Sequence, residues 1–322
     1  MMKTAHRDGY GPPEILSIRE VPIPEPGAGE ILVRVRAATV NRTDCGALSG
    51  RPYVYRFFVG WPRPRVVATG TDFAGEVVAT GPGCTRFAVG DRVMGFDDDN
   101  LGSHAQYLRV AERRAICRIP DGVPYEVTAA SLEGAHYARN AIDRVPLEPG
   151  DPVLVNGATG AIGSAAVQLL ADLGARVTAV CPGPHRAAIE ARGAARTIDF
   201  RAAPFPEQLR GERFAFVFDA VGKSSFAACA PLLRRSGCYL STELGPYGEN
   251  PALALLAPLM RPSVRFPIPQ DVPRTLERIA PMLAAGTFRP LVDRTYPLEE
   301  LREAFRYVAS GEKVGNVLLA LD

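Results

Sequence analysis

Lysine is scarce in this 322-residue sequence, and so is any concentration of positive charge. The chain has 34 arginines but only 3 lysines, and the basic residues are spread along its length at a net charge of +2. Proteins that bind nucleic acid usually gather basic residues on one face or in one tail, and no such block occurs here. We therefore expect no nucleic-acid partner.

The sequence also lacks cysteine pairs and long apolar runs. Its six cysteines form no C-x-x-C pair, which fits neither a zinc ribbon nor a disulfide framework. The longest clean apolar run, residues 251–260, is too short to cross a bilayer. The N-terminal segment MMKTAHRDGYG has no apolar core and no small-residue cleavage site. These absences predict a reduced, cytoplasmic protein that does not bind a membrane.

The chain contains enough apolar residues to form two hydrophobic cores. Hydrophobic residues make up 47% of the chain and charged residues 22%, which is typical of a globular protein long enough for two domains. The first 120 residues contain short strand-like runs, such as 31–37, 75–79 and 91–95, separated by glycine and proline turns. This spacing fits a compact antiparallel barrel or sandwich.

From about residue 124 the pattern changes to helices that alternate with strands. The predicted helices are 125–145, 161–173 and 186–192, and the predicted strands are 152–155, 176–180, 197–200, 214–222 and 237–245. Such alternation predicts an α/β fold with a parallel sheet and crossover helices. Two amphipathic helices, 275–285 and 298–309, and a strand at 316–321 complete the chain.

The segment NGATGAIG, residues 156–163, joins a predicted strand to a predicted helix. In such a unit the first glycine permits a tight turn, the second lets the backbone approach a pyrophosphate, and the third lets the helix pack on the strand. The helix N-terminus and exposed amides then hold the anion. The alternative is a glycine turn without a ligand. The context favours a dinucleotide site formed by Gly157, Ala158, Thr159, Gly160, Ala161, Ile162 and Gly163.

The next strand indicates which dinucleotide binds. An NAD site usually ends this strand with an acid that bonds the ribose 2′-hydroxyl, whereas a 2′-phosphate requires a cation. Here the strand ends in Cys181, and residues 181–189 contain no acid but do contain His185 and Arg186. We therefore expect NADPH (NADP+) as the cofactor. The alternative is that both basic residues simply lie on the exposed start of a helix.

Five stretches together resemble the medium-chain dehydrogenase/reductase superfamily, and within it the zinc-free branch of quinone oxidoreductases and enone reductases. The resemblance covers essentially the whole chain. The matching stretches are VPIPEPGAGEILVRVRAATVNRTD, GTDFAGEVVATGPGCTRFAVGDRVMGF, VLVNGATGAIGSAAVQLLADLGARVTAV, FDAVGKSSF and RPLVDRTYPLEELREAFRYVASGEKVGNVLL.

This resemblance implies both the architecture and the partners. Residues 1–124 and 270–322 should form a GroES-like β-barrel catalytic domain, and residues 125–269 a doubly wound Rossmann domain that binds the cofactor. Relatives commonly form homodimers by pairing the edges of their nucleotide-domain sheets, so we expect a homodimer that acts on a small-molecule substrate.

Metal binding is a further point on which the resemblance bears. In the zinc-bearing alcohol dehydrogenases of the superfamily, a Cys ligand stands where this chain has Asn41, and His followed by Glu stands where it has Thr71 and Asp72. Cys45 is out of register, and one cysteine without a nearby histidine cannot form a tetrahedral zinc site. We expect no metal. Without a Lewis acid, hydride delivery to a quinone or an α,β-unsaturated carbonyl is easier than oxidation of an alcohol.

The candidate catalytic residues follow from the resemblance. Asn41 and Thr43 should face the nicotinamide, and Thr43 could hold the substrate oxygen or instead bond its own backbone. Tyr53 lies near the tyrosine that quinone reductases place over the substrate, although the register also allows Tyr55. His136 or Tyr137 could donate a proton to the reduced product. A packed helix residue is the alternative for His136.

The resemblance also gives further cofactor contacts. They are Phe200, Val221, Gly222, Leu244, Gly245 and Asn316. Lys223 could touch a phosphate, or it could be an exposed turn lysine. Three hypotheses remain: an NADPH-dependent, zinc-free quinone or enone reductase; an NAD(P)-dependent alcohol dehydrogenase or carbonyl reductase; and a non-catalytic NADPH-binding protein. A short-chain dehydrogenase is disfavoured because the chain has no Y-x-x-x-K motif.

Overall fold

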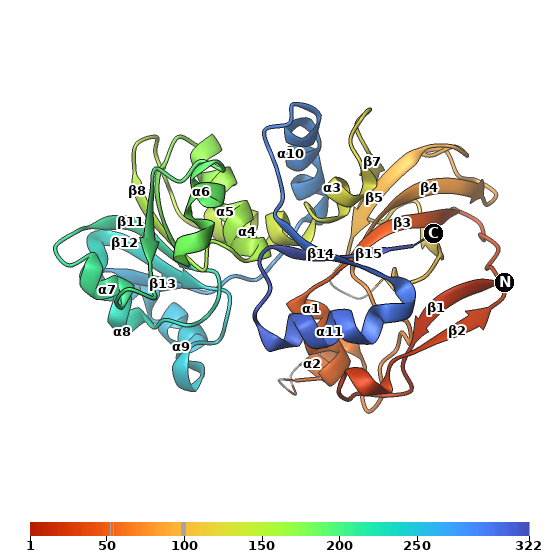
Figure 1. Ribbon diagram of the computed structural model, residues 1–322, viewed down its shortest axis with the longest axis horizontal. Helices are drawn as coiled ribbons and strands as arrows, with labels where there is room; N and C mark the ends of the chain where they lie inside the picture. The colour runs from red at the N-terminus through yellow and green to blue at the C-terminus, as the bar shows by residue number, and fades with distance from the viewer. Residues whose placement is uncertain (52, 54, 98–100, 322) are drawn as a thin grey trace. The chain divides into compact units, whose positions relative to one another are not determined.

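The computed structural model describes residues 1–51, 53, 55–97 and 101–321, which form two compact units (Figure 1). The first unit comprises Met1–Glu133 and Asp271–Asp322, and the second comprises Gly134–Gln270. The first unit extends to Glu133, beyond the expected boundary at residue 124, and therefore includes the short helix α3 (Tyr125–Ala129). This helix packs on two strands of the first unit, β3 (Glu30–Val40) and β4 (Asp72–Thr80).

A seven-stranded sheet organises the first unit. Its strand order is β14–β15–β3–β4–β5–β7, and β6 pairs with β3. The pairs are antiparallel except for β14 with β15. The remaining bounds are β5 (Arg92–Phe96), β6 (Tyr107–Ala111), β7 (Ile116–Arg118), β14 (Val292–Pro297) and β15 (Asn316–Ala320), with a separate pair, β1 (Met2–His6) and β2 (Ser17–Val21). The predicted antiparallel β character is confirmed.

One helix of this unit covers the sheet core with its apolar residues. In α11 (Leu301–Ser310), the buried residues Leu301, Ala304, Phe305 and Val308 recur at helical spacing and join the cluster that contains the inward side chains of β3. The other helices are η1 (Pro13–Ile15), α1 (Arg42–Ser49), α2 (Tyr55–Val59), α10 (Val272–Ala284) and η6 (Leu298–Glu300). Both predicted amphipathic helices are therefore present.

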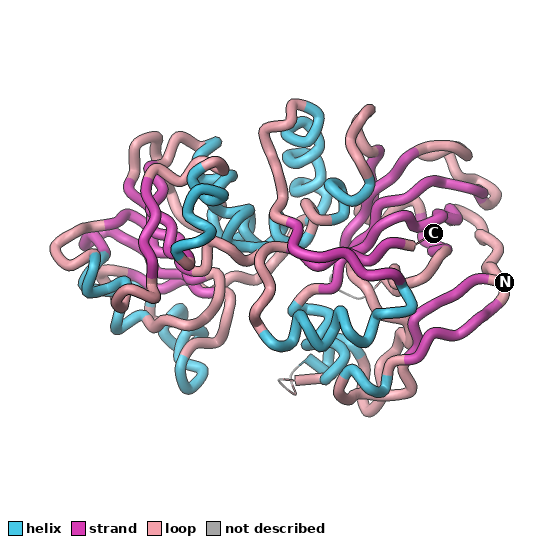
Figure 2. The backbone as a smooth tube through the Cα atoms, viewed as in Figure 1, coloured by secondary structure: helices cyan, strands magenta, loops and turns pink. Residues whose placement is uncertain are grey.

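A six-stranded parallel sheet forms the second unit, and Figure 2 distinguishes its strands from its helices. The order is β10–β9–β8–β11–β12–β13, so the direction of winding reverses between β8 and β11. The strands are β8 (Pro152–Asn156), β9 (Arg176–Cys181), β10 (Arg196–Asp199), β11 (Phe214–Asp219), β12 (Leu233–Ser241) and β13 (Ser263–Arg265). This is the predicted doubly wound sheet, in which ligands bind beyond the carboxyl ends of the strands.

The helices of the second unit connect these strands. They are α4 (Glu133–Ile142), α5 (Ala161–Asp172), η2 (Gly183–His185), α6 (Arg186–Glu190), α7 (Phe205–Gln208), α8 (Phe226–Cys229), η3 (Ala230–Leu232), η4 (Pro246–Gly248), α9 (Glu249–Leu255) and η5 (Ala257–Leu259). None of the helices among the described residues is long and apolar enough to cross a membrane.

Several predicted elements differ from the observed ones at their ends, and one is divided. The helix predicted over 125–145 is divided into α3 and α4, because the N–H groups of Ser131 and Leu132 bond the carbonyls three residues earlier in a tight turn. The strand predicted over 237–245 starts earlier and ends at Ser241. Leu244 and Gly245 consequently lie in the loop that follows β12.

Candidate active site

The glycine turn after β8 is tightly packed at two of its three glycines. Gly157 has a φ of 79°, and a Cβ atom there would lie 2.7 Å from the Cβ of Val221. A Cβ at Gly163, in the first turn of α5, would lie 2.1 Å from the carbonyl oxygen of Gly157. At Gly160, which caps α5, the nearest atom would be that same oxygen at 3.5 Å. The turn therefore leaves room at Gly160, the position at which turns of this kind let a pyrophosphate approach the backbone.

The first turn of α4 packs against the start of α5. A Cβ at Gly134 would lie 2.7 Å from the carbonyl oxygen of Ala161, so the two helices meet at close range. His136 and Tyr137 follow on α4, with their rings edge to face at 5.7 Å. His136 is buried, whereas Tyr137 is half-buried. Of these two candidate proton donors, Tyr137 is the one that retains access to solvent.

The end of β9 carries a feature that the sequence did not indicate. Cys181 is buried, and burial raises the pKa of its thiol to about 11. In the parallel register, Asp199 of β10 pairs with Cys181. The Asp199 carboxylate accepts hydrogen bonds from the backbone N–H groups of Gly183 at 3.0 Å and Arg201 at 2.9 Å. An acid, Asp199, therefore does lie at this edge, but it comes from the neighbouring strand β10 and not from β9. The sequence signal for it was the Asp near the end of the strand predicted at 197–200.

The two basic residues expected at a 2′-phosphate lie beside this edge. Arg186 is exposed, and its Nε donates to the hydroxyl of Thr197 at 2.8 Å. His185 is half-buried at the end of η2. The Arg186 side chain is thus held along the sheet edge by Thr197, with the guanidinium still open to solvent.

A pocket of about 610 Å³ lies at the carboxyl ends of β10 and β11 within the second unit. Two predicted cofactor residues, Phe200 and Gly222, line it together with Lys223. Two further predicted cofactor residues, Val221 and Leu244, are exposed. This position is the edge at which doubly wound sheets bind nucleotides. Asn316, in the first unit, is buried, and its Nδ2 donates to the Leu291 carbonyl at 2.9 Å.

Asn41 lies between β3 and α1 and is built into a buried polar network. Its backbone N–H donates to the Asp44 carboxylate at 2.8 Å, and its Nδ2 donates to the Thr39 hydroxyl at 2.5 Å. Asp72 accepts the Thr39 backbone N–H at 2.7 Å and the Thr39 hydroxyl. Burial raises the pKa of Asp44 to about 8 and that of Asp72 to about 7, against the opposing effect of these hydrogen bonds.

The residues at the zinc-ligand positions do not fit a zinc ion. The Asn41 amide nitrogen is a donor already engaged by Thr39, and the buried Thr71 hydroxyl, which has no hydrogen-bond partner, is not a usual zinc ligand. Burial raises the pKa of the Cys45 thiol to about 12, which keeps it protonated. Both ring nitrogens of His104 are engaged, by the Thr69 hydroxyl and the Thr39 carbonyl.

The described part of the chain contains no group of three His, Cys, Asp or Glu side chains that could hold a metal.

Thr43 lies on the first turn of α1, half-buried, and its hydroxyl donates to the side chain of Glu133. Glu133 is only 5% exposed. The sequence did not point to this partner, because it lies 90 residues away and belongs to no motif. The sequence suggested two roles for the Thr43 hydroxyl, a substrate contact or a bond to its own backbone. Neither role involves the Glu133 carboxylate.

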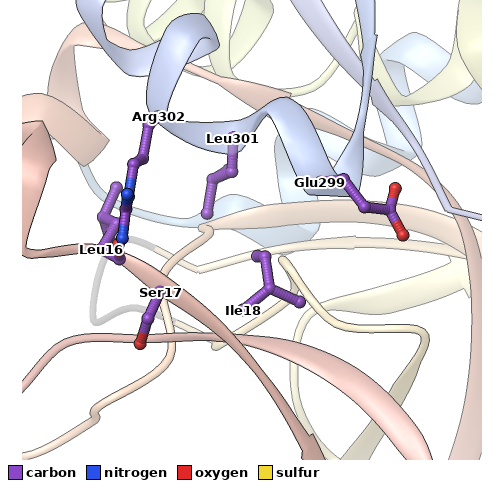
Figure 3. Close-up of a pocket in the computed structure, with 6 residues that line it drawn as sticks. All are labelled: Leu16, Ser17, Ile18, Glu299, Leu301 and Arg302. Carbon is purple, nitrogen blue, oxygen red and sulfur yellow. The ribbon is translucent and has the colours of Figure 1, made fainter.

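The tyrosine candidates lie near α2. Tyr53 is 59% exposed, and the Arg56 guanidinium lies 4.9 Å from the centre of its ring. The side chain of Tyr55 lies outside the described residues. A separate pocket of about 290 Å³ in the first unit is bordered by Leu16, Ile18 and Arg302 among others, and none of the predicted site residues lines it (Figure 3).

Two family models match the chain. The alcohol dehydrogenase GroES-like domain matches residues 27–121, and the zinc-binding dehydrogenase domain matches residues 192–319. The chain belongs to the medium-chain dehydrogenase/reductase superfamily. The predicted GroES-like and Rossmann fold is thereby confirmed. Membership of the superfamily implies oxidoreductase chemistry with a nicotinamide cofactor.

Individual relatives narrow the comparison. The quinone oxidoreductase of Pseudomonas aeruginosa is 27% identical over 99% of both chains. The acryloyl-coenzyme A reductase of Metallosphaera sedula is 28% identical over 98% of this chain and 97% of its own. Pikromycin polyketide synthase component PikAII of Streptomyces venezuelae is 29% identical over 92% of this chain, which spans 8% of that protein.

A solved structure shares the fold from end to end. The quinone oxidoreductase of Coxiella burnetii superimposes with a TM-score of 0.88 at 22% identity, covering 100% of this chain and 99% of its own. Because the identity is low, this likeness shows the fold alone.

Proposed function

We propose that the protein is an NADPH-dependent reductase that transfers a hydride, without zinc, to a quinone or to the activated C=C bond of an α,β-unsaturated carbonyl. The observation that carries this proposal is the Thr43 hydroxyl bonded to the Glu133 carboxyl group, two residues after an amide, Asn41, at a zinc-ligand position. These groups can hold a developing oxyanion, but they cannot act as a Lewis acid.

The chain's own residues provide the cofactor site. When bound, NADPH supplies the hydride. The amides of the turn from Gly157 to Gly163 and the N-terminus of α5 hold the pyrophosphate. Arg186 and His185 meet the 2′-phosphate, while Phe200 and Gly222 border the adenosine. Val221, Leu244, Gly245 and Asn316 complete the contacts that the resemblance implies.

On the substrate side, Thr43 holds the substrate oxygen. One well-aimed donor of this kind contributes about 3 to 4 kcal/mol, or roughly 10² to 10³ in rate. Asn41 keeps the loop in place through Thr39, and Tyr53 lies over the substrate. Tyr137, half-buried on α4, gives the proton at the second reduced atom. A role for His136 as the donor is less well supported, because its ring is buried.

NADPH oxidation with a panel of quinones, enones, aldehydes and alcohols tests the reaction. We expect turnover with the quinones or enones and slower or no turnover with the others. Fastest turnover of aldehydes or alcohols would support a carbonyl reductase or alcohol dehydrogenase instead. Tight NADPH binding with no turnover of any acceptor would contradict the proposal and support a binding protein.

Cofactor preference has its own test, because Asp199 lies at the same edge as Arg186. We expect NADPH to bind more tightly than NADH, and Arg186→Ala to weaken NADPH binding about tenfold, or ~1.4 kcal/mol. Fluorescence titration of both cofactors measures this. NADH affinity equal to that of NADPH, or a loss of NADH binding in Asp199→Asn alone, would show that the carboxylate serves the ribose diol instead.

A further inference from the structure

Three exposed aromatic side chains lie together at α2 in the first unit. Tyr53, Phe57 and Trp61 are 59%, 71% and 63% exposed, and the rings of Phe57 and Trp61 stack 6.1 Å apart at an angle of 9°. A contiguous group of exposed aromatic rings is typical of a binding surface. The proposed function places only Tyr53 at the substrate, so Phe57 and Trp61 have no role in it.

Arg56 lies among these rings. Its guanidinium carbon lies 4.6 Å from the ring centre of Tyr10, 4.9 Å from that of Tyr53 and 5.8 Å from that of Trp61. Rings that stack on a guanidinium occupy its faces, whereas its N–H groups lie in its plane and stay available for hydrogen bonds. The Nε atom donates to the Gly50 carbonyl at 3.3 Å. The rings and this bond therefore hold the Arg56 head group in place, and the N–H donors of its two Nη atoms remain.

No carboxylate of the described residues pairs with Arg56, and its Nη atoms form no hydrogen bond with them. The surrounding segment, residues 45–71, contains four arginines and no aspartate or glutamate. Arg294 of β14 shows the contrast, because it also stacks on a tyrosine, Tyr307, but has Asp293 Oδ1 at 3.9 Å from its Nε. A half-buried arginine that is held in place without a counter-ion is suited to bind an anion from outside the protein.

Arg56 is attached to the helix that carries Thr43. Helix α2 packs on α1 (Figure 1), and Gly50, whose carbonyl Arg56 bonds, caps the C-terminal end of α1. Thr43 lies in the first turn of the same helix. At about 1.5 Å per residue, the helix extends about 10 Å from Thr43 to Gly50. A substrate with its reacting oxygen at Thr43 and an anionic group at Arg56 must therefore span a distance on the order of 10 Å.

We propose that Arg56 binds a carboxylate of the substrate, and that the protein reduces α,β-unsaturated carbonyl compounds with a carboxylate about 10 Å from the reacting oxygen. This inference rests on the proposed function. The guanidinium donates two parallel hydrogen bonds to the two carboxylate oxygens. The rings of Tyr53, Phe57 and Trp61 cover the apolar part of the substrate between its carboxylate and its carbonyl group. Arg56 thus selects and positions the substrate, and no bond is made or broken at this site.

Binding without turnover gives the main test, because Trp61 is the only tryptophan of the chain and lies beside Arg56. Its fluorescence is titrated with hydrocinnamate and with hydrocinnamamide, the neutral compound of nearly the same shape, neither of which has an activated C=C bond to reduce. We expect the native protein to bind the carboxylate about tenfold more tightly than the amide, and Arg56→Met to bind both equally. Equal binding of both by the native protein, or a preference that survives in Arg56→Met, would overturn the proposal.

Two further variants separate the guanidinium from its charge and from stacking. Arg56→Lys keeps the positive charge but cannot bond both carboxylate oxygens, so the preference should fall to about threefold. This variant also covers the case in which Arg56→Met does not fold. Arg294→Met removes an arginine that likewise stacks on a tyrosine, and it should leave the preference unchanged. The full preference in Arg56→Lys, or its loss in Arg294→Met, would contradict recognition by the Arg56 guanidinium.

Kinetics with matched enones separate this inference from the proposed function. Two derivatives of benzylideneacetone are compared, one with a carboxylate and one with a carboxamide at the para position of the ring. We expect kcat/KM to be about tenfold higher for the carboxylate, through a lower KM, and this difference to disappear in Arg56→Met. Reduction of both with equal kcat/KM would overturn the carboxylate site and leave the proposed reaction intact. Reduction of neither, with a preference for hydrocinnamate that depends on Arg56, would instead overturn the proposed function.

Discussion

The glycine turn of the second unit and the Thr43 loop of the first unit are both short connections between a strand and a helix, yet different kinds of contact hold them in place. Most of the turn depends on contacts within about seven residues, such as Gly163 against Gly157, although Val221 also packs on Gly157. The Thr43 loop depends on partners far along the chain: Asp72 for Thr39 and Asn41, and Glu133 for Thr43. Local spacing therefore defines most of the glycine turn, whereas contacts between distant residues define the Thr43 loop.

The largest effect on stability should come from a side chain added inside the glycine turn. Gly163→Val would place side-chain atoms where a Cβ alone lies 2.1 Å from the Gly157 oxygen, so α5 must shift away from the strand. We expect a loss of about 3 kcal/mol in the free energy of unfolding, measured with urea. Gly160→Ala is the matched control, with a change within about 0.5 kcal/mol but weaker NADPH binding. Equal stability of the two variants would break the claim that the turn is fixed by local packing.

A smaller effect concerns the buried carboxyls that support the Thr43 loop. Asp72 has an ordinary pKa of 3.8 and a pKa of about 7 in the folded protein. Between these values the folded chain holds a proton that the unfolded chain releases, so stability falls as the pH rises, by at most about 1.4 kcal/mol per unit. Asp72→Asn should make the free energy of unfolding, measured with urea, less dependent on pH from 5 to 7, by about 2 kcal/mol over this range.

The control for this experiment is a carboxyl group whose pKa is shifted in the opposite direction, downward. Hydrogen bonds from Arg118 lower the pKa of Asp91, so its proton is already released throughout this range. Asp91→Asn should leave the slope between pH 5 and 7 unchanged. An unchanged slope in Asp72→Asn would contradict a protonated carboxyl beneath the Thr43 loop.

The smallest expected effect is that of metal removal. Because an amide and a hydroxyl occupy the zinc-ligand positions, dialysis against EDTA should leave NADPH oxidation within error of the untreated protein. Addition of Zn²⁺ should not raise the rate. A loss of activity that only Zn²⁺ restores would show that the loop binds a metal after all.

The same contrast explains what the sequence could predict. Periodicity and the glycine spacing sufficed for the parallel sheet, β8, the turn and α5, because these depend on neighbouring residues. The antiparallel character of the first unit followed from alternation in β3. The break between α3 and α4 was missed because the turn residues 130–132 carry no glycine or proline.

Within the candidate site, the sequence did not reveal which residues far apart in the chain lie side by side. Asp199 reaches the end of β9 through strand register, and Glu133 reaches Thr43 through a contact that spans 90 residues. Neither belongs to a local motif. Asn41 and Thr43 could be selected from the sequence by resemblance, but the network that holds them required the structure.

The fate of the hydride tests the central claim most directly. NADPH carrying deuterium at the transferred position of C4 would be used to reduce the enone that turns over fastest, and the product analysed by mass spectrometry and NMR. The account predicts one deuterium at the β-carbon of a saturated ketone and a solvent proton at the α-carbon. Deuterium at the carbonyl carbon of an unsaturated alcohol, or a product without deuterium, would contradict it.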